Sequence, residues 1–167
     1  MLLKQKMETP KTTDEREVDL TLEQKEVIAA VKERKSVFVT GPGGTGKSFL
    51  LRHLVKLLRS MKWMVTVTAT TGVAATLIGG STVHSFAGIG VGMESTEAIV
   101  KRIRGGKKRE DWQRTSVLVI DEISMMAPDL FDKLDAIGRG VRGNQEPFGG
   151  LQVIVFGDYF QLPPVAK

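Results

Sequence analysis

The feature that most constrains the fold is a short apolar run, a glycine-rich loop and an amphipathic segment in direct succession. Residues 36–40, SVFVT, predict a buried strand, and residues 41–48, GPGGTGKS, match the pattern G-x-x-x-x-G-K-[ST]. The leucines of residues 47–61, KSFLLRHLVKLLRSM, recur at helical spacing. In this context the loop amides and the helix N-terminus converge on phosphate oxygens, so the pattern predicts a nucleoside triphosphate site. A chance glycine turn is the alternative, and the flanking strand and helix argue against it.

The chemistry of such a loop assigns roles to its residues. Lys47 is predicted to reach the β- and γ-phosphates, and the Ser48 hydroxyl to join the shell of a magnesium ion. The predicted nucleotide contacts within the loop and at the start of the helix are Gly41, Pro42, Gly43, Gly44, Thr45, Gly46, Lys47, Ser48 and Phe49.

Apolar runs and helical stretches alternate along the remaining chain. Further strands are predicted at residues 64–69, 116–122 and 151–158, and a helix at residues 127–139 with Pro128 in its first turn. Another helix is predicted from Thr21, where Gln24 three positions later completes a capping box. This alternation predicts an α/β fold with a mostly parallel sheet and helices on both faces. We expect one domain over residues 20–167, preceded by a disordered lead-in at residues 1–19.

Two later segments have chemistry that suits the loop. Asp121 and Glu122 follow a buried apolar run, so we expect Asp121 to hold magnesium through water and Glu122 to orient or deprotonate the attacking water. A plain strand end is the alternative for this pair. Gln161 follows the last predicted strand, which in such sheets lies beside the loop strand, and is predicted to sense the γ-phosphate. Its alternative is a turn glutamine in solvent.

Composition excludes several other classes of site. The chain has no cysteine and only two histidines, which excludes thiolate or His-rich metal sites and cysteine nucleophiles. No apolar run approaches the roughly 18 residues of a membrane span. An Asn-Lys-x-Asp element for guanine is absent, because the single Asn, Asn144, lies in GNQEP. The net charge of +5 is concentrated in Lys101–Glu110, which reads either as a footprint for a phosphate backbone or as a solvated surface loop.

Five motifs, in order, carry a resemblance to a known family. LEQ, GPGGTGKS, TATTGVAATLIGGSTVHSFAGIG, VLVIDEISMM and VIVFGDYFQLPP resemble the early motifs of the PIF-one-type DNA helicases, superfamily-one enzymes related to RecD. The resemblance implies a RecA-like P-loop NTPase domain that uses ATP and Mg²⁺. It also implies that Gln24 reads adenine, a role compatible with the capping box.

The block from Thr68 to Gly90 resembles the single-strand contact motifs of that family. The resemblance implies DNA binding at Thr71, Gly72, His84 and Phe86, and small donors, glycines and rings suit that role. The alternative is a helix TGVAATLI followed by a hairpin, with Phe86 in the core. Trp63, Trp112, Met125 and Met126 are interpreted as packing residues.

Helicases of this family resemble two RecA-like halves around one ATP, and this chain resembles the first half. The resemblance implies an ATP-dependent 5′-to-3′ DNA helicase acting on single-stranded DNA or DNA with a 5′ overhang, in recombination, repair and telomere maintenance, in the nucleus or mitochondrion. For this chain alone, without the second half, we expect weak Mg-ATP binding, slow hydrolysis and no unwinding. The alternative is a non-enzymatic half-domain that binds ATP and single strands and acts through a partner.

Overall fold

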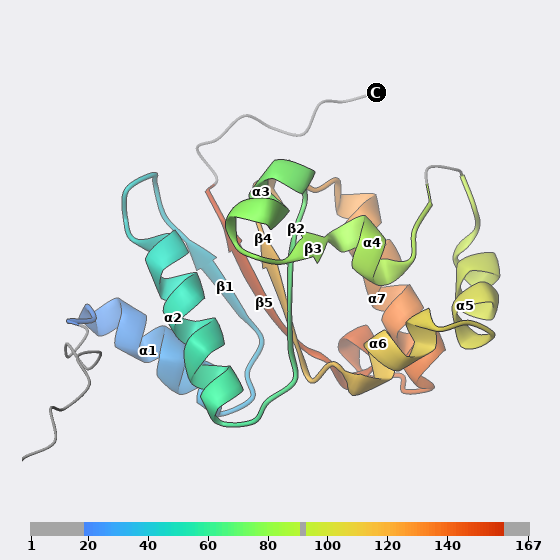
Figure 1. The fold of residues 1–167 in the computed structure, drawn as a ribbon, viewed down its shortest axis with the longest axis horizontal. Helices are drawn as coiled ribbons and strands as arrows, with labels where there is room; N and C mark the ends of the chain where they lie inside the picture. Colours follow the sequence, from blue (N-terminus) through green and yellow to red (C-terminus); the bar gives the residue numbers. More distant parts are fainter. Residues whose placement is uncertain (1–18, 91–92, 159–167) are drawn as a thin grey trace, which may run out of the picture.

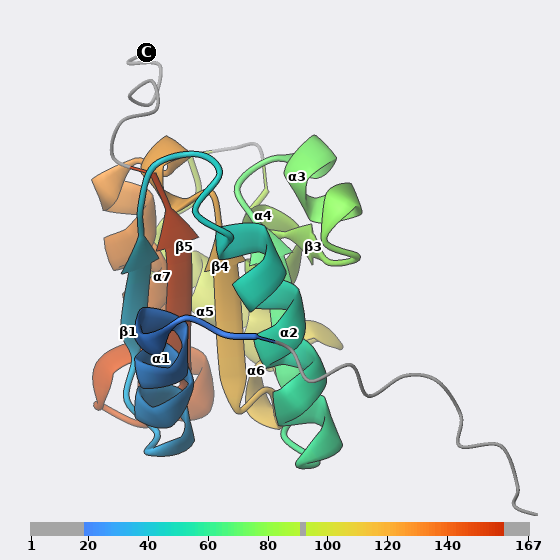
Figure 2. The same ribbon diagram turned by 90° about the vertical axis from the view of Figure 1, so that its left-hand side faces the viewer.

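Five parallel strands form the centre of the computed structural model, which describes residues 19–90 and 93–158. The strands are β1 (Val37–Thr40), β2 (Val65–Ala69), β3 (Ser81–Thr82), β4 (Val117–Asp121) and β5 (Gln152–Gly157). Their order in the sheet is β1-β5-β4-β2-β3, and every pairing is parallel. All five strands therefore end at the same edge of the sheet (Figures 1 and 2).

Helices cover both faces of this sheet, as predicted. They are α1 (Leu22–Lys32), α2 (Lys47–Ser60), α3 (Gly72–Leu77), α4 (Val83–Ala87), α5 (Thr96–Arg104), α6 (Lys108–Arg114) and α7 (Pro128–Arg142), with 3-10 turns η1 (Ile123–Met125) and η2 (Pro147–Gly150). One core lies between the sheet and α1 and α2, and the other lies beneath α4 to α7 (Figure 2). Within the described residues, no helix has the length and apolar character needed to cross a membrane.

The alternation of side chains along β4 explains why its sequence is continuously apolar. Val117 and Val119 enter the core beneath α1 and α2, whereas Leu118 and Ile120 enter the core beneath α4 to α7. All four side chains are completely buried. Because a parallel sheet covered on both faces exposes neither set, each of these residues contributes about 1.5–3 kcal/mol by burial.

The predicted start signals of two helices are confirmed. The Thr21 hydroxyl accepts a hydrogen bond from the Gln24 backbone N–H at 3.2 Å, and the Gln24 side-chain oxygen accepts from the Thr21 N–H at 3.1 Å. Pro128 occupies the first turn of α7, where its missing N–H leaves no helical bond unmade.

The segment after β2 differs from the hairpin alternative. α3 crosses over to β3, which pairs parallel with β2 at Thr68 and Ala69, and α4 begins directly afterwards. Gly80 makes the close return possible, because a Cβ at this position would lie 2.3 Å from the Val67 carbonyl oxygen. The chain therefore adds a short parallel edge strand instead of turning back.

Two smaller expectations need correction. The basic segment Lys101–Glu110 is not a surface loop: it forms the end of α5 and the start of α6, which are interrupted at Gly105 and Gly106. The glycine break itself is confirmed. Met126 is buried, but Met125 is 48% exposed, because the 3-10 turn η1 directs neighbouring side chains to different sides.

Candidate nucleotide site and nucleic-acid edge

The glycine loop connects the end of β1 at Thr40 to the start of α2 at Lys47. Gly44 and Gly46 both have φ of 82°, a left-handed conformation that disfavours residues with a Cβ. These two glycines let the loop curl over the N-terminus of α2, whose first N–H groups have no partners within the helix. The strand–loop–helix arrangement predicted from the sequence is confirmed.

The Lys47 side chain donates hydrogen bonds to backbone carbonyls of the glycine loop. Its ammonium donates to the carbonyl oxygen of Pro42 at 2.9 Å and also to that of Gly41. The Thr45 hydroxyl donates to the same Pro42 carbonyl at 2.9 Å. A triphosphate would offer Lys47 charged acceptors in place of these two carbonyls, which strengthens its hydrogen bonds.

A pocket of about 520 Å³ lies between α1, β1 and the loop. Gln24 and Phe38 line it, together with Thr45 and Lys47 from the loop. The Gln24 amide nitrogen lies 3.1 Å from the position of a Cβ on Gly46, so one side chain caps α1 and also reaches the loop. Phe38 is 41% exposed and offers an apolar wall for a base. Sequence reasoning missed Phe38. The signal that could have identified it is its position in the strand that leads into the glycine loop.

The acidic pair lies at the end of β4, two strands from β1. The Glu122 N–H donates to the Asp121 carboxylate at 2.9 Å, and the Thr70 hydroxyl donates to the Glu122 carbonyl at 3.1 Å. Glu122 adopts a left-handed conformation with φ of 57°, which is uncommon for a residue other than glycine. Residues held in such conformations are concentrated at functional sites.

Burial raises the pKa of the Asp121 carboxyl, opposed by the Glu122 N–H and by the charge of Lys47. Burial also raises the pKa of Glu122, and the neighbouring charges of Asp121 and Asp158 raise it further, while Lys47 lowers it. The effect of the Lys47 charge on both carboxylates agrees with the topology, in which the glycine loop and the acidic pair lie at the same edge of the sheet. A raised pKa makes the Glu122 carboxylate more basic, which suits a group that accepts a proton from water.

β5 lies between β1 and β4, so the predicted neighbour of the loop strand is confirmed. Its last residue, Gly157, pairs with Thr40 at the end of β1. Asp158 follows at this edge and is buried. Sequence reasoning missed Asp158, although its place directly after an apolar strand repeats the signal that marked Asp121. Gln161 lies outside the described residues.

Three of the predicted DNA contacts lie at the other half of the edge, where β2 and β3 end. Thr71 caps α3 by accepting a hydrogen bond from the Ala74 N–H at 3.2 Å, which leaves its hydroxyl proton free to donate. Gly72 and His84 are exposed. The structure thus brings Thr71, Gly72 and His84 to one rim beside the acidic pair.

Phe86 corrects one expectation. Its side chain is 4% exposed, and its ring packs against Trp112 with the ring centroids 4.8 Å apart. The structure supports the packing role over base stacking, because the apolar core beneath α4 to α7 encloses the ring. Trp112 is completely buried, as interpreted from the sequence, while Trp63 is half-buried beneath the Arg34 guanidinium.

The residues at the edge fit a magnesium ion held partly by its substrate. Ser48 at the start of α2 and Asp121 at the end of β4 supply one hydroxyl and one carboxylate. Within residues 19–90 and 93–158, no group of three or more His, Cys, Asp or Glu side chains is placed to hold a metal. Magnesium commonly takes one or two protein oxygens together with waters and phosphates, and Ser48 and Asp121 offer donors of this kind and number.

Comparison with known proteins agrees with this geometry. The sequence model described as PIF1-like helicase matches residues 19–167. The chain belongs to the PIF1-like helicase family. Over 152 residues it is 53% identical to the ATP-dependent DNA helicase PIF1 of Emericella nidulans, covering 87% of this chain and 20% of that relative. The human ATP-dependent DNA helicase PIF1 is 50% identical over 149 residues, covering 89% of this chain and 23% of its own length.

Solved structures of PIF1-like helicases confirm the RecA-like fold class. The Pif1 helicase from Candida albicans superposes with a TM-score of 0.83 at 49% identity, covering 89% of this chain and 34% of that one. The Bacteroides Pif1 bound to single-stranded DNA gives a TM-score of 0.77 at 40% identity, with the same two coverages. This PIF1-like chain therefore spans about a fifth of these curated relatives and a third of these solved chains.

Proposed function

We propose that the chain is the ATP-binding half of an ATP-dependent 5′-to-3′ DNA helicase motor. The observation that carries this proposal is that the glycine loop, Asp121 and Glu122 follow the parallel strands β1 and β4, whose ends lie at one edge of the sheet. The names of the relatives and a Bacteroides structure in complex with ADP-AlF4 support ATP as the nucleotide. Structures of relatives with single-stranded and forked DNA support a DNA substrate. That this substrate includes DNA with a 5′ overhang is part of the proposal and rests on the family resemblance.

In the proposed mechanism, the loop amides and Lys47 bind the triphosphate, and Gln24 and Phe38 contact the base. Ser48 and Asp121 would hold Mg²⁺, which would supply charge stabilisation at the phosphates. Glu122 orients the attacking water and accepts its proton, and Gln161 responds to loss of the γ-phosphate. Thr71, Gly72 and His84 contact the single strand beside this site, and the bond from Thr70 to Glu122 connects the two halves of the edge.

We further propose that the residues needed for unwinding extend beyond those of this chain. Hydrolysis by P-loop enzymes depends on an arginine finger, and its absence costs about 10³ to 10⁵ in rate. Translocation also requires two grips that alternate with the nucleotide state. We propose that the arginine finger and the second grip come from a part of the protein that corresponds to the unmatched parts of the solved relatives. For the 167 residues alone we expect weak Mg-ATP binding, slow hydrolysis and no strand displacement.

Thermal unfolding with and without Mg-ATP tests the nucleotide site. A ligand at 100 times its Kd stabilises a protein by about 2.7 kcal/mol, so the wild type should unfold at a higher temperature with Mg-ATP. Lys47→Met keeps the aliphatic stem but removes the charge, and it should abolish most of this shift. An equal shift in both proteins would refute the site.

The second candidate is a non-enzymatic half-domain that binds ATP and single strands and acts through a partner. The share of the relatives that this chain covers favours it: the chain spans 20% of the Emericella nidulans relative, so the arginine finger of the proposed motor would come from residues outside these 167. Single-stranded DNA should accelerate ATP hydrolysis if the chain is a motor half. Binding of both ligands without any acceleration would favour the half-domain.

On the family resemblance, we also propose that the protein resides in the nucleus or the mitochondrion. The same resemblance is the basis for proposing roles in DNA repair, recombination and telomere maintenance. Imaging of a fluorescent fusion in the source cells tests the compartment. Exclusion of the fusion from both organelles would contradict it.

A further inference from the structure

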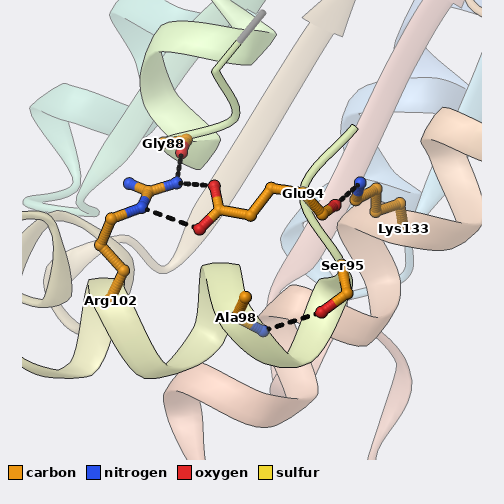
Figure 3. Close-up of polar contacts among 6 residues, drawn as sticks. All are labelled: Gly88, Glu94, Ser95, Ala98, Arg102 and Lys133. Carbon is orange, nitrogen blue, oxygen red and sulfur yellow. Dashed lines mark hydrogen bonds and ion pairs between the residues drawn. The ribbon is translucent and has the colours of Figure 1, made fainter. Parts of the chain in front are cut away.

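The basic segment Lys101–Glu110 is not used by the nucleotide site. Its six basic side chains fall into two groups. Arg102 is neutralised, because its guanidinium makes two hydrogen bonds to Glu94 and a third to the Gly88 carbonyl (Figure 3). Lys108 pairs with Asp111. These two residues do not contribute free positive charge.

The other four basic side chains keep their charge. Lys101, Lys107 and Arg109 are exposed, and their side chains make no hydrogen bond or ion pair within the part of the chain that the structure describes. Arg104 donates to a neutral acceptor, the Gly140 carbonyl, at 2.9 and 2.6 Å. A backbone carbonyl fixes the direction of this guanidinium without neutralising it.

Three arginines line one pocket of about 330 Å³ at the junction of α5, α6 and α7. The lining residues are Arg104, Arg109, Gln113, Val141, Arg142 and Gly143. Arg142 donates to the carbonyls of Gly149, Trp112 and Thr115, and burial lowers the pKa of its guanidinium. None of the residues lining this pocket is acidic. Guanidinium groups fixed by carbonyls and lacking a carboxylate are prepared for a phosphate.

This basic surface lies away from the nucleotide edge. α7 runs back from that edge, where it follows the acidic pair, to Arg142, shortly before the start of β5. α6 likewise ends just before the start of β4. α6 and the end of α7 lie toward the opposite edge of the sheet, on the face not covered by α1 and α2 (Figures 1 and 2). The pocket is lined by residues of these segments and of the end of α5, so it lies away from the nucleotide site. A nucleic-acid strand bound at Thr71 and His84 would therefore not contact this pocket through the same residues.

The chemistry of this surface favours a double-stranded nucleic acid over a single strand. Surfaces that hold single strands combine positive charge with aromatic rings on which bases stack. The only aromatic side chain between Lys101 and Arg114, Trp112, is completely buried. A surface of cations without rings contacts phosphates alone, and a duplex presents phosphates at the higher density.

We propose that Lys101, Arg104, Lys107, Arg109 and Arg142 form a second nucleic-acid surface, which binds the phosphate backbone of a duplex. It acts independently of ATP binding and of the single-strand contacts at the other edge. In a protein that moves along one strand, such a surface would hold the duplex beside the motor.

Fluorescence anisotropy on the 167-residue chain tests this proposal with a labelled blunt duplex and a labelled single strand. Lys107→Ala/Arg109→Ala removes two free charges, and both side chains are exposed, so folding is preserved. The matched control, Lys32→Ala/Lys56→Ala, removes two exposed lysines of α1 and α2, on the other face. Their side chains make no hydrogen bond or ion pair among the described residues. Each lost duplex contact lowers the slope of log affinity against log salt by about 0.9.

For the double variant we expect the slope for duplex to fall by about 2. Between about 50 and 200 mM salt, the wild type should then lose about tenfold more duplex affinity than the variant. Single-strand affinity should stay at the wild-type value, and the control should match the wild type on both ligands. Arg109→Lys, which keeps the charge, should retain most of the duplex binding of the wild type.

Two results would overturn the proposal. One is an equal salt slope for the double variant and the control, which would make the surface a solvated face. The other is displacement of the duplex by polyglutamate at equal charge concentration, which would indicate an acidic protein partner. Lys47→Met should bind the duplex like the wild type, so failure of the nucleotide site leaves this test intact.

Discussion

Substitution of Phe86 by leucine separates the two roles that the sequence allowed for this residue. The ring is 4% exposed and packs on Trp112 at a centroid distance of 4.8 Å. Leucine keeps most of the apolar volume, and such a swap costs less than about 1.5 kcal/mol. Loss of the aromatic pair adds about 0.5–1.5 kcal/mol. The free energy of unfolding should therefore fall by about 1–3 kcal/mol, and the Tm by about 2–12 °C.

The same variant should bind single-stranded DNA as the wild type does, because the core encloses the ring. A base stacked on Phe86 would be worth about 1–3 kcal/mol, a loss of about 5- to 150-fold in affinity. Anisotropy with labelled oligothymidylate, measured well below the Tm of the variant, gives this number. His84→Ala is the contrasting variant, since this exposed ring lies at the proposed DNA rim and its loss should weaken binding. A loss of tenfold or more for folded Phe86→Leu would refute the packing interpretation.

Three further predictions concern the nucleotide edge. Thr70→Val removes the 3.1 Å hydrogen bond to the Glu122 carbonyl, worth about 0.5–1.5 kcal/mol, so steady-state hydrolysis should slow while the Kd for Mg-ATP is kept. Glu122→Gln should raise the Tm of the free protein at neutral pH. Because folding raises the pKa of Glu122, its negative charge opposes folding above that pKa. The gain in Tm from Glu122→Gln should therefore disappear as the pH falls below about 4.5. Thermal melts over a pH series measure this. Gly157→Ala would place a Cβ 2.6 Å from a methyl of Ile123 and should lower the free energy of unfolding by about 1–3 kcal/mol in denaturant titrations. Gly43→Ala, whose Cβ has no neighbour within 4 Å, is the control. A Glu122→Gln gain that persists at low pH, or equal losses for the two glycine variants, would contradict these two predictions.

Local patterns in the sequence were sufficient where a residue's role depends on its neighbours in the chain. The glycine loop, the capping box of Thr21 and the first turn of α7 are set by residues a few positions apart, and all were predicted correctly. The two-faced burial of β4 also follows from its own apolar run. Because all strands are parallel, the ends of β1 and β4 had to meet at one edge.

Roles that depend on contacts between distant residues could not be assigned in this way. The edge position of β3, the packing of Phe86 on Trp112, and the hydrogen bond from Thr70 to Glu122, 52 positions apart, appear only when the sheet assembles. The basic segment is a further case: its composition is visible in the sequence, but its partners are not. Composition gives the number of charges, whereas packing decides which of them are neutralised. The sequence by itself therefore determined the nucleotide loop, and the tertiary structure decided which rings and cations remain available to a ligand.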